Sequence, residues 1–224
     1  MSLLTRQTLV DGTYLREMAR TDVQPWDEVA VDRSLAETLA ARDGKPVWVF
    51  AYGSLMWNPL LATQEQQLGT LHGWRRSFCL CSVSGRGTPE SPGRVLSLQA
   101  GGRVDGLALR LGDTALHDEL RLLWTREMAG GCYRPIWAPV ALRDGRTVRA
   151  IAFAADVLHP QHAHDDSPDA VARVIRHAAG RFGANADYLE ALGHALDGLG
   201  LRDAYVERVR AAARALSGHP EGAA

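Results

Sequence analysis

Residues 47–59, VWVFAYGSLMWNP, constrain the fold more than any other part of the chain. The first six form a short apolar run of the kind found in fully buried β-strands. The run stops at Gly53-Ser54, and apolar residues then resume. Glycine has no purpose in such a strand, but it permits a sharp turn and a close approach of the backbone to a ligand. We therefore expect a strand followed by a turn that either simply ends the strand or holds a ligand.

Further strands are expected from alternating or short apolar segments bounded by turn residues. These segments are residues 70–82, 93–102, 104–112, 132–142 and 146–155. The glycine pair at 101–102 predicts a hairpin between the second and third segments, and Asp-Gly at 144–145 predicts one between the last two. Pro135 and Pro139 indicate that the fourth segment is irregular or lies at a sheet edge.

Helices are expected where apolar residues recur every three or four positions. These segments are residues 113–127, 167–183, 186–200 and 201–216. Asp113, Ser167 and Asn185 stand at the starts of the first three and predict N-caps. Two shorter amphipathic pieces, residues 12–19 and 32–44, precede the first strand.

This order of elements predicts an α+β fold, with a mostly antiparallel sheet or small β-barrel-like core, flanking helices and C-terminal helices. The sequence shows no βαβ rhythm and lacks the GxGxxG and GxxxxGK[ST] patterns of nucleotide-binding proteins. We expect an N-terminal helical extension at residues 1–46 that covers the core, one domain at 47–216 and a disordered tail at 217–224.

Composition excludes several classes of protein. The formal net charge of the 224 residues is −1, so no broad attraction to nucleic acid or to an anionic membrane is expected. No segment approaches the ~18–20 apolar residues of a membrane span, and the N-terminus does not read as a secretory signal. Three cysteines, Cys79, Cys81 and Cys132, indicate a reducing compartment instead of a disulfide framework. We expect a cytoplasmic protein with no obligate protein partner.

A second feature is Glu127, within LLWTREMAGGCYRP at residues 122–135. It stands at the end of a predicted helix, where the helix dipole disfavours a negative charge. Apolar residues precede it, so a raised carboxyl pKa and a role in proton transfer are expected. The alternative is a solvated surface glutamate paired with Arg126.

These two stretches together resemble the ChaC-type γ-glutamylcyclotransferases. The resemblance extends to GWRRSFCLCSVSGRGTPESPGRVLSL at residues 73–98 and to GANADYLEALGHAL at 183–196, so it covers most of residues 47–200. It implies the small barrel-like α+β γ-glutamylcyclotransferase fold. It also implies cleavage of glutathione to 5-oxoproline and cysteinylglycine, with no cofactor and no metal.

The resemblance also assigns roles to residues. It makes Glu127 the catalytic acid and base. It places the γ-glutamyl group of the substrate against Val49, Phe50, Ala51, Tyr52, Gly53 and Ser54. Two departures from the family pattern are Ala51, where glycine is usual, and Cys132, inserted before Tyr133. Ala51 narrows the space behind the turn and so bears on substrate fit.

The residue types suit this chemistry. The substrate's own α-amine attacks its γ-carbonyl and closes a five-membered lactam, so no serine or cysteine nucleophile is needed. A desolvated glutamate can take the ammonium proton and return one to the departing amine. The N–H groups of Gly53 and Ser54 could hold the α-carboxylate or the developing oxyanion, and Tyr133 could hydrogen-bond either group.

Two loops could add to the site. Residues 84–95 form either an ordinary connection or a lid, in which Arg86 or Arg94 would meet the glycyl carboxylate of glutathione. Residues 159–169 carry three histidines and an Asp-Asp pair. They form either a metal site or, in our interpretation, a solvated loop.

Three functions remain to be compared. The first is a glutathione-specific γ-glutamylcyclotransferase. The second is an enzyme of the same fold that acts on γ-glutamyl-amino acids or γ-glutamylamines. The third is a non-catalytic protein that regulates cation transport. The presence of Glu127 together with an intact Tyr52-Gly53-Ser54 favours an enzyme.

Overall fold

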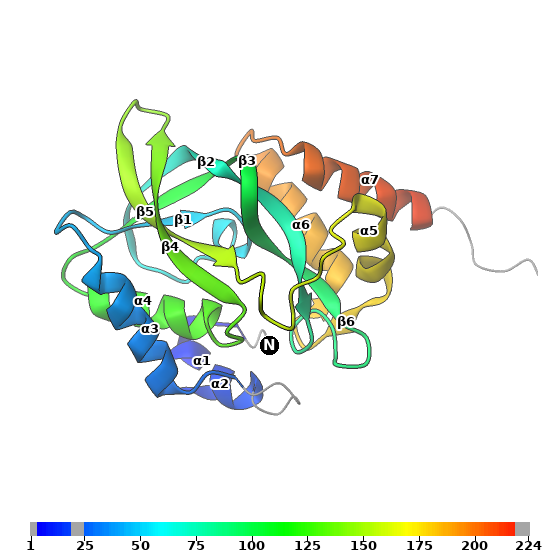
Figure 1. Ribbon diagram of the computed structural model, residues 1–224, viewed down its shortest axis with the longest axis horizontal. Helices are drawn as coiled ribbons and strands as arrows, with labels where there is room; N and C mark the ends of the chain where they lie inside the picture. Colours follow the sequence, from blue (N-terminus) through cyan, green and yellow to red (C-terminus); the bar gives the residue numbers. More distant parts are fainter. Residues whose placement is uncertain (1–3, 19–24, 218–224) are drawn as a thin grey trace, which may run out of the picture.

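Figure 1 shows the computed structural model, which describes residues 4–18 and 25–217. Its centre is a closed barrel with the strand order β1-β3-β2-β4-β5. The strands are β1 (Trp48–Ala51), β2 (Thr63–Ser82), β3 (Gly93–Leu111), β4 (Tyr133–Leu142) and β5 (Thr147–Ala155). Most neighbours are antiparallel, and a parallel pairing of β1 with β5 closes the barrel. The predicted α+β class with a small barrel is confirmed.

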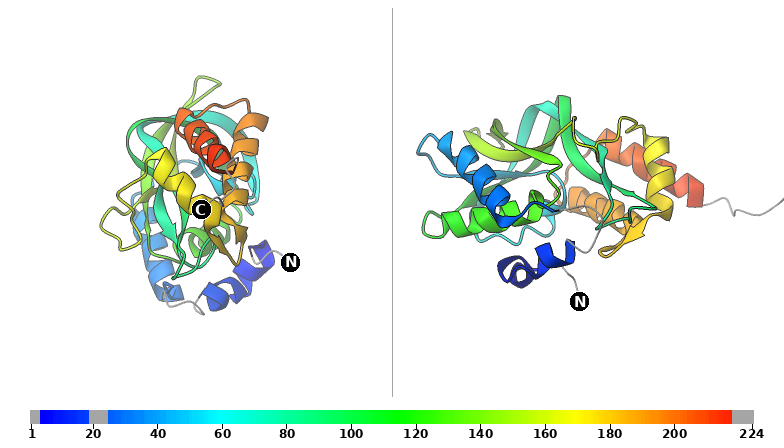
Figure 2. Two further views of the ribbon diagram at one scale, coloured as in Figure 1. Left: turned by 90° about the vertical axis from the view of Figure 1, so that its right-hand side faces the viewer. Right: turned by 60° about the horizontal axis from the view of Figure 1, so that its bottom comes forward.

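Helices cover the barrel on two sides (Figures 1 and 2). One side carries α1 (Arg6–Val10), α2 (Thr13–Met18), α3 (Glu28–Ala40) and α4 (Leu116–Glu127). The other carries α5 (Pro168–His177), α6 (Asn185–Gly198) and α7 (Ala204–Ser217). Three short elements complete the fold: η1 (Ser54–Met56), β6 (Ala179–Gly180) and β7 (Gly183–Ala184). Residues 1–3 and 19–24 of the predicted extension, and 218–224 of the predicted tail, lie outside the described residues.

The hairpin predicted at residues 101–102 is wrong. The two segments around it are one continuous strand, β3, which pairs with β2 over most of its length. Gly73 in β2 and Gly101 and Gly102 in β3 have φ values of 81°, 105° and 82°, which L side chains rarely adopt, and the register shifts beside Gly73. These glycines let the two strands bend together at a bulge, so the chain does not reverse there.

The second predicted hairpin, at residues 144–145, is confirmed as the turn between β4 and β5. β4 pairs with β5 along its whole length but with β2 only at residues 140–142. Pro135 and Pro139 lie where β4 pairs with β5 alone, so their missing N–H groups leave no second ladder incomplete. This agrees with the expected edge position.

Asn185 does not cap α6 as predicted, because α6 already includes it. Its buried amide instead ties α6 to β3: Oδ1 accepts from the Arg94 N–H at 2.6 Å, and Nδ2 donates to the Arg94 carbonyl at 2.8 Å. A buried amide with both polar atoms paired to one backbone residue fixes the position of the helix against the barrel.

The predicted ends of two other helices are also corrected. α4 begins at Leu116, three residues after Asp113, and no side chain caps it. Ser167 stands at the N-cap position of α5, but its hydroxyl makes no capping hydrogen bond. α5 ends at His177, since the chain then forms the β6–β7 pair. α1 was not predicted, and α3 begins earlier than predicted, after the N-cap Asp27.

The predicted burial of the first strand is confirmed. Trp48 and Phe50 contribute to a core cluster that includes residues of α5, α6 and α7. Val49 and Ala51 belong to a second cluster, shared with α3 and α4. Because alternate side chains of a strand point to opposite faces, β1 must be apolar at every position to fill both clusters.

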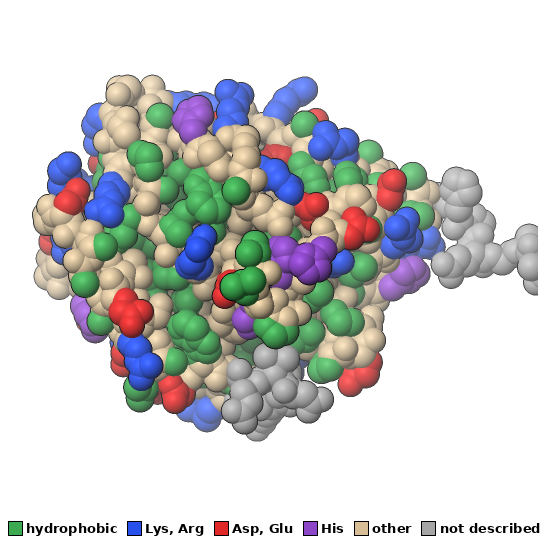
Figure 3. Space-filling model, in the orientation of Figure 1, with side chains coloured by type: hydrophobic (Ala, Val, Ile, Leu, Met, Phe, Trp, Pro, Cys, Tyr) green, Lys and Arg blue, Asp and Glu red, His purple; other side chains and the backbone are tan. Residues whose placement is uncertain are grey.

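The surface carries both signs of charge in a mixed pattern. Figure 3 shows acidic and basic side chains interspersed over the visible face, as the net charge of −1 leads one to expect. Within residues 4–18 and 25–217, no helix combines the length and the apolar character that crossing a lipid bilayer requires.

Candidate active site

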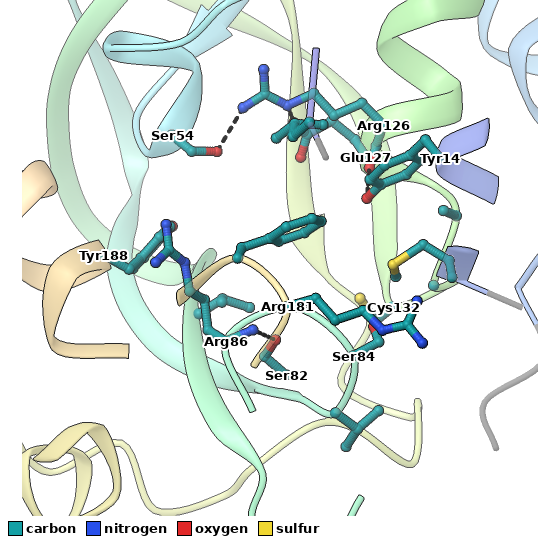
Figure 4. A pocket seen from close by; sticks show the side chains of 18 of the residues that line it. Tyr14, Ser54, Ser82, Ser84, Arg86, Arg126, Glu127, Cys132, Arg181 and Tyr188 are labelled. Atoms are coloured by element: carbon teal, nitrogen blue, oxygen red, sulfur yellow. Dashed lines mark hydrogen bonds and ion pairs between the residues drawn. The ribbon is translucent and has the colours of Figure 1, made fainter. Parts of the chain in front are cut away.

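A cavity of about 470 Å³ lies beside the barrel (Figure 4). Its wall includes Ser54 after β1, Arg126 and Glu127 at the end of α4, and Tyr188 of α6. A smaller recess continues from it, because Ser54, Glu127 and Tyr188 line both spaces. Tyr52 and Gly53 line only the recess. The Gly53-Ser54 turn and Glu127 thus line one continuous space.

The turn predicted at Gly53-Ser54 is the single 3₁₀ turn η1, which begins at Ser54, after Tyr52 and the N-cap Gly53. The Met56 N–H donates to the Gly53 carbonyl at 2.8 Å, and the Asn58 N–H donates to the Ser54 carbonyl at 3.0 Å. The first N–H groups of such a turn have no partner within the turn. The turn therefore brings backbone donors to the recess that Gly53 and Ser54 line.

Glu127 is the last residue of α4, as the sequence predicts. Its side chain is 13% exposed, and one carboxylate oxygen lies 2.9 Å from Nε of Arg126. Burial raises the pKa of Glu127, while the Arg126 guanidinium acts in the opposite direction. The ion pair between Glu127 and Arg126 that the alternative predicts is therefore present. It lies in a largely buried place, however, and this burial still favours the protonated carboxyl group.

Arg126 joins Glu127 to the turn. Its Nη2 donates to Ser54 Oγ at 2.8 Å, and its Nη1 donates to the carbonyls of Asn58 and Pro59. The side chain is 3% exposed. Because a guanidinium presents its donors in a rigid fork, these bonds fix the distance between the end of α4 and η1. Sequence analysis considered Arg126 only as a surface partner and missed this role.

Tyrosine hydroxyls surround the recess. Tyr52 donates to the Phe153 carbonyl, and Tyr133 donates to the Leu96 carbonyl at 3.0 Å. Burial raises the pKa of Tyr188 to about 12, with a smaller contribution from Glu127. A phenol has a single O–H, and Tyr52 and Tyr133 already donate theirs to backbone carbonyls. Tyr188, which stays protonated at neutral pH, is therefore the phenol of these three that can donate a hydrogen bond to a bound anion.

The structure separates the residues that the resemblance assigned to the substrate. Tyr52, Gly53 and Ser54 line the recess. Val49, Phe50 and Ala51 are fully buried in β1 and are absent from the lining of both spaces. In this structure these three residues position the turn through core packing.

Tyr188 is a lining residue that sequence analysis did not select. Its ring packs edge-on against Trp57 with 5.5 Å between centroids, and the guanidinium carbon of Arg86 lies 5.8 Å from its ring centroid. Within the α6 segment, Tyr188 precedes the buried Leu189 and belongs to the same apolar stripe. Periodicity therefore indicates only that the ring is buried, and it cannot indicate that a cavity lies beside the ring.

The loop at residues 84–95 contributes one of the two arginines considered. Arg86 lines the cavity, and its Nη1 donates to the Ala184 carbonyl at 3.0 Å. Arg94 instead donates to the carbonyls of Phe78 and Asp165 and does not line the cavity. A Cβ on Gly87 would lie 2.1 Å from the Gly93 nitrogen, so the two arms of the loop pack tightly. Whether the loop opens as a lid stays a prediction.

The histidine-rich segment 159–169 has partners of its own. Asp166 accepts hydrogen bonds from Arg75 at 2.7 Å and Ser77 at 2.6 Å, which ties the segment to β2. In the described part of the chain, no three His, Cys, Asp or Glu side chains are grouped closely enough to hold a metal ion.

Replacing Gly53 with valine is expected to obstruct the recess. A Cβ at this position would lie 3.5 Å from the Tyr188 hydroxyl and 3.6 Å from Leu96 Cδ2, so the two methyl groups of valine would enter the space. We expect kcat/KM for the substrate to fall roughly tenfold or more, because small displacements at a reacting centre are costly. Gly53→Ala, whose added carbon fits at contact distance, is the matched control and should lose much less. Equal rates for Gly53→Val and wild type would contradict the close approach inferred here.

The amino-acid sequence is similar to a known family and to known enzymes. Residues 47–216 match the family described as ChaC-like protein. The glutathione-specific γ-glutamylcyclotransferase of Escherichia coli (strain K12) is 50% identical over 179 residues, which are 80% of this chain and 78% of that protein. Human glutathione-specific γ-glutamylcyclotransferase 1 is 29% identical over 153 residues, 66% of this chain and 69% of that one.

Solved structures agree on the fold. A crystal structure of a glutathione-specific γ-glutamyl cyclotransferase from yeast superposes with a TM-score of 0.69 at 19% identity, covering 77% of this chain and 99% of that one. At this identity the likeness concerns the fold alone. Together with the match over residues 47–216, which contains η1, α4 and β4, it confirms the resemblance noted from the sequence. The chain therefore belongs to the ChaC-like protein family.

Proposed function

We propose that this protein cleaves the γ-glutamyl bond of glutathione by intramolecular cyclisation and releases 5-oxoproline and cysteinylglycine. One observation carries the proposal: Glu127 and the Gly53-Ser54 turn line the same recess, held together by Arg126. The relatives from Escherichia coli and human carry names for this activity. Their names and the geometry of the recess point to the same substrate class.

Glu127 acts first as the base. In the substrate the α-amino group is an ammonium, and it must lose a proton before its lone pair can attack the γ-carbonyl carbon. A carboxylate whose pKa is raised by burial accepts that proton more readily than an exposed one. The amine nitrogen then bonds to the carbonyl carbon and closes the five-membered ring, with the carbonyl oxygen becoming an oxyanion.

Glu127 acts next as the acid. As the oxyanion collapses, the bond between the former γ-carbonyl carbon and the cysteinyl nitrogen breaks, and the protonated Glu127 donates its proton to that nitrogen. The ring nitrogen still carries a second, extra proton, which passes through Glu127 to the released amine, so that cysteinylglycine leaves as an ammonium. One carboxyl group thus serves all these transfers and returns to its starting state. No water is consumed in either step.

Two groups of donors are assigned to the substrate's charges. The backbone N–H groups at the start of η1 hold the α-carboxylate, since they are brought to the recess without a partner inside the turn. The phenol of Tyr188, which lines the same recess, stabilises the oxyanion by a hydrogen bond. The cysteinylglycine portion then extends into the larger cavity, where we assign Arg86, one of the arginines that line it, to its carboxylate.

The decisive experiment is a product assay with a panel of γ-glutamyl compounds. Purified protein is incubated with glutathione, with γ-glutamylalanine and with a γ-glutamylamine, and 5-oxoproline is quantified by mass spectrometry. We expect glutathione to give the highest kcat/KM. A preference for either of the other two would support an enzyme of the same fold with a different substrate, and no 5-oxoproline from any compound would contradict the proposal.

We also propose that the protein works in the reducing environment of the cytoplasm. Its three cysteines are all free, with Cys79 and Cys132 buried and Cys81 partly exposed. Thiols that stay unpaired fit a compartment in which glutathione itself is reduced.

A further inference from the structure

The N-terminal helices form part of the cavity wall. Leu4, Tyr14 of α2, Met18 and Pro25 all line the space that also contains Glu127. Figure 4 shows Tyr14 beside Arg126 and Glu127. Its hydroxyl lies 3.5 Å from the Arg126 carbonyl, and the residue is 5% exposed. These residues precede position 47, so they lie outside the segment that matches the family.

This wall is anchored to α4. The guanidinium of Arg6 in α1 makes a two-pronged ion pair with the carboxylate of Glu119, whose side chain is only 4% exposed. Arg6 also donates to the Leu60 carbonyl at 3.0 Å. Bidentate pairs of this kind fix orientation as well as distance. α1 is therefore held against the helix that carries Glu127.

A second anchor lies on the far side of the cavity. The rings of Tyr14 and Phe182 stack with 6.2 Å between centroids and 8° between planes. Arg181, next to Phe182, donates to the carboxylate of Glu17 in α2 at 2.9 Å. α2 thus contacts both α4 and the segment between β6 and β7, and it lines the cavity between them.

A third contact supports the turn after Glu127. The backbone N–H of Trp26 donates to the Ala129 carbonyl at 2.8 Å. A Cβ on Gly131 would lie 2.4 Å from Nε1 of the same tryptophan, and Gly131 has a φ of 67°. Only glycine lets Trp26 pack so closely against this turn.

We propose that the N-terminal wall determines which leaving groups the enzyme accepts, with Tyr14 as the specificity-determining residue. The inference rests on the proposed function. The recess has a volume of about 20 Å³, which admits only the end of the γ-glutamyl group that reaches the Gly53-Ser54 turn. The rest of the substrate, including the departing residue, must lie in the outer cavity, which Tyr14 lines together with Glu127. A rigid ring at that place sets an upper limit on the size of the departing residue's side chain. Cysteine fits within this limit, and a cysteine that carries a bulky S-substituent does not.

The test compares glutathione with S-benzylglutathione, the same tripeptide with an added ring. For wild type we expect kcat/KM to be at least about tenfold lower with S-benzylglutathione, the scale of discrimination that a filled pocket provides. In Tyr14→Ala the ratio of kcat/KM for glutathione to kcat/KM for S-benzylglutathione should fall about tenfold, toward one. In Tyr14→Phe, which keeps the ring, the ratio should stay at the wild-type value. Tyr14→Leu, which keeps apolar contacts, replaces the alanine variant if the latter does not fold.

Leu9→Ala is the control for destabilisation. It shows whether a change in the substrate ratio comes from the lost cavity lining or only from loosened packing of the N-terminal helices. Leu9 is buried in α1, packs in the same apolar cluster as Tyr14 and does not line the cavity. We expect a lower Tm and an unchanged substrate ratio. The proposal is overturned if Leu9→Ala shifts the ratio as Tyr14→Ala does, if Tyr14→Ala leaves it unchanged, or if wild type accepts both substrates equally.

Calorimetric dissociation constants measured in the Glu127→Gln background, with and without Tyr14→Ala, compare the binding of the two tripeptides without turnover. If glutathione were not cleaved, the proposed function would fail, and the binding ratio of wild type and Tyr14→Ala would still decide the role of the wall. A tenfold shift in that ratio supports it, and an unchanged ratio overturns it.

Discussion

Glu127→Gln is expected to lower kcat/KM for glutathione by about 10²–10⁴-fold, the usual contribution of a general acid–base group. Glutamine has nearly the same shape and can still accept the hydrogen bond from Nε of Arg126. It cannot take a proton from the substrate ammonium, so cyclisation loses both its base and its acid. The loss should appear mainly in kcat, because the donors of η1 and the cavity wall remain in place.

The pH dependence gives this prediction a second measurement. Burial raises the pKa of Glu127, so kcat/KM of the wild type should rise with pH along a limb whose midpoint lies above the ordinary glutamate value of about 4.3. The folded state holds this proton more tightly than the unfolded state. Stability from this group is therefore complete below the unfolded pKa and is lost as pH rises through the folded pKa. Glu127→Gln should accordingly gain stability relative to wild type between acidic and neutral pH.

Glu119→Gln is the matched control on the same helix. Glu119 is also buried, but its hydrogen bond with Arg6 lowers its pKa. Its stabilising contribution is present above the unfolded pKa and is lost as pH falls through the folded one, the opposite sign to Glu127. We expect this variant to lose stability at neutral pH and to keep kcat/KM within a few-fold of wild type. Turnover by Glu127→Gln close to the wild-type rate would remove Glu127 from the mechanism.

Local patterns in the sequence were enough to predict much of the fold. The apolar run before Gly53 predicts a strand buried on both faces, and the Asp-Gly pair at 144–145 predicts a true hairpin. The glycines at 101–102 misled because glycine permits positive φ both in a hairpin and in a bulge. Only the partner strand distinguishes the two, and here Gly73 of β2 bends at the matching position.

The candidate site was predictable to a similar extent. Gly53 and Glu127 were found because a glycine after a buried strand and an acid at a helix end are locally unusual. The roles of Arg126 and Tyr14 depend on distant partners, namely Ser54 for the first and Phe182 for the second. No local pattern encodes a distance between segments so far apart, so these roles require the tertiary structure.

The most consequential structural contact away from Glu127 is made by Arg76 of β2, which is 2% exposed. Its Nε donates to the Tyr52 carbonyl at 2.8 Å, and its Nη2 donates to the Asp105 carbonyl at 2.6 Å. Its Nη1 pairs with Asp203, just before α7, at 2.9 Å. One side chain therefore connects the residue before Gly53, the strand β3 and the C-terminal helix.

Arg76→Met is expected to lower the free energy of unfolding by about 3–5 kcal/mol, the usual cost of removing one partner of a buried ion pair. The Asp203 carboxylate, with only 12% of its side chain exposed, would lose its counter-charge, and two carbonyls would lose their donor. Urea titration followed by tryptophan fluorescence measures the change, since the chain has six tryptophans. The double variant Arg76→Met with Asp203→Leu should recover part of the loss, because no unpaired charge then remains.

Arg121→Met provides the comparison that isolates burial. Arg121 also pairs with two acids, Glu28 at 3.0 Å and Asp32 at 2.9 Å, but its side chain is 38% exposed. Exposed pairs of this kind contribute about 0–1 kcal/mol, since water already solvates both charges. If Arg76→Met cost no more than Arg121→Met, then the buried guanidinium would not be what holds α7 and the residue before Gly53 to the barrel. A large loss at Arg76, with turnover falling before the fold is lost, would instead show that the turn depends on this contact for its geometry.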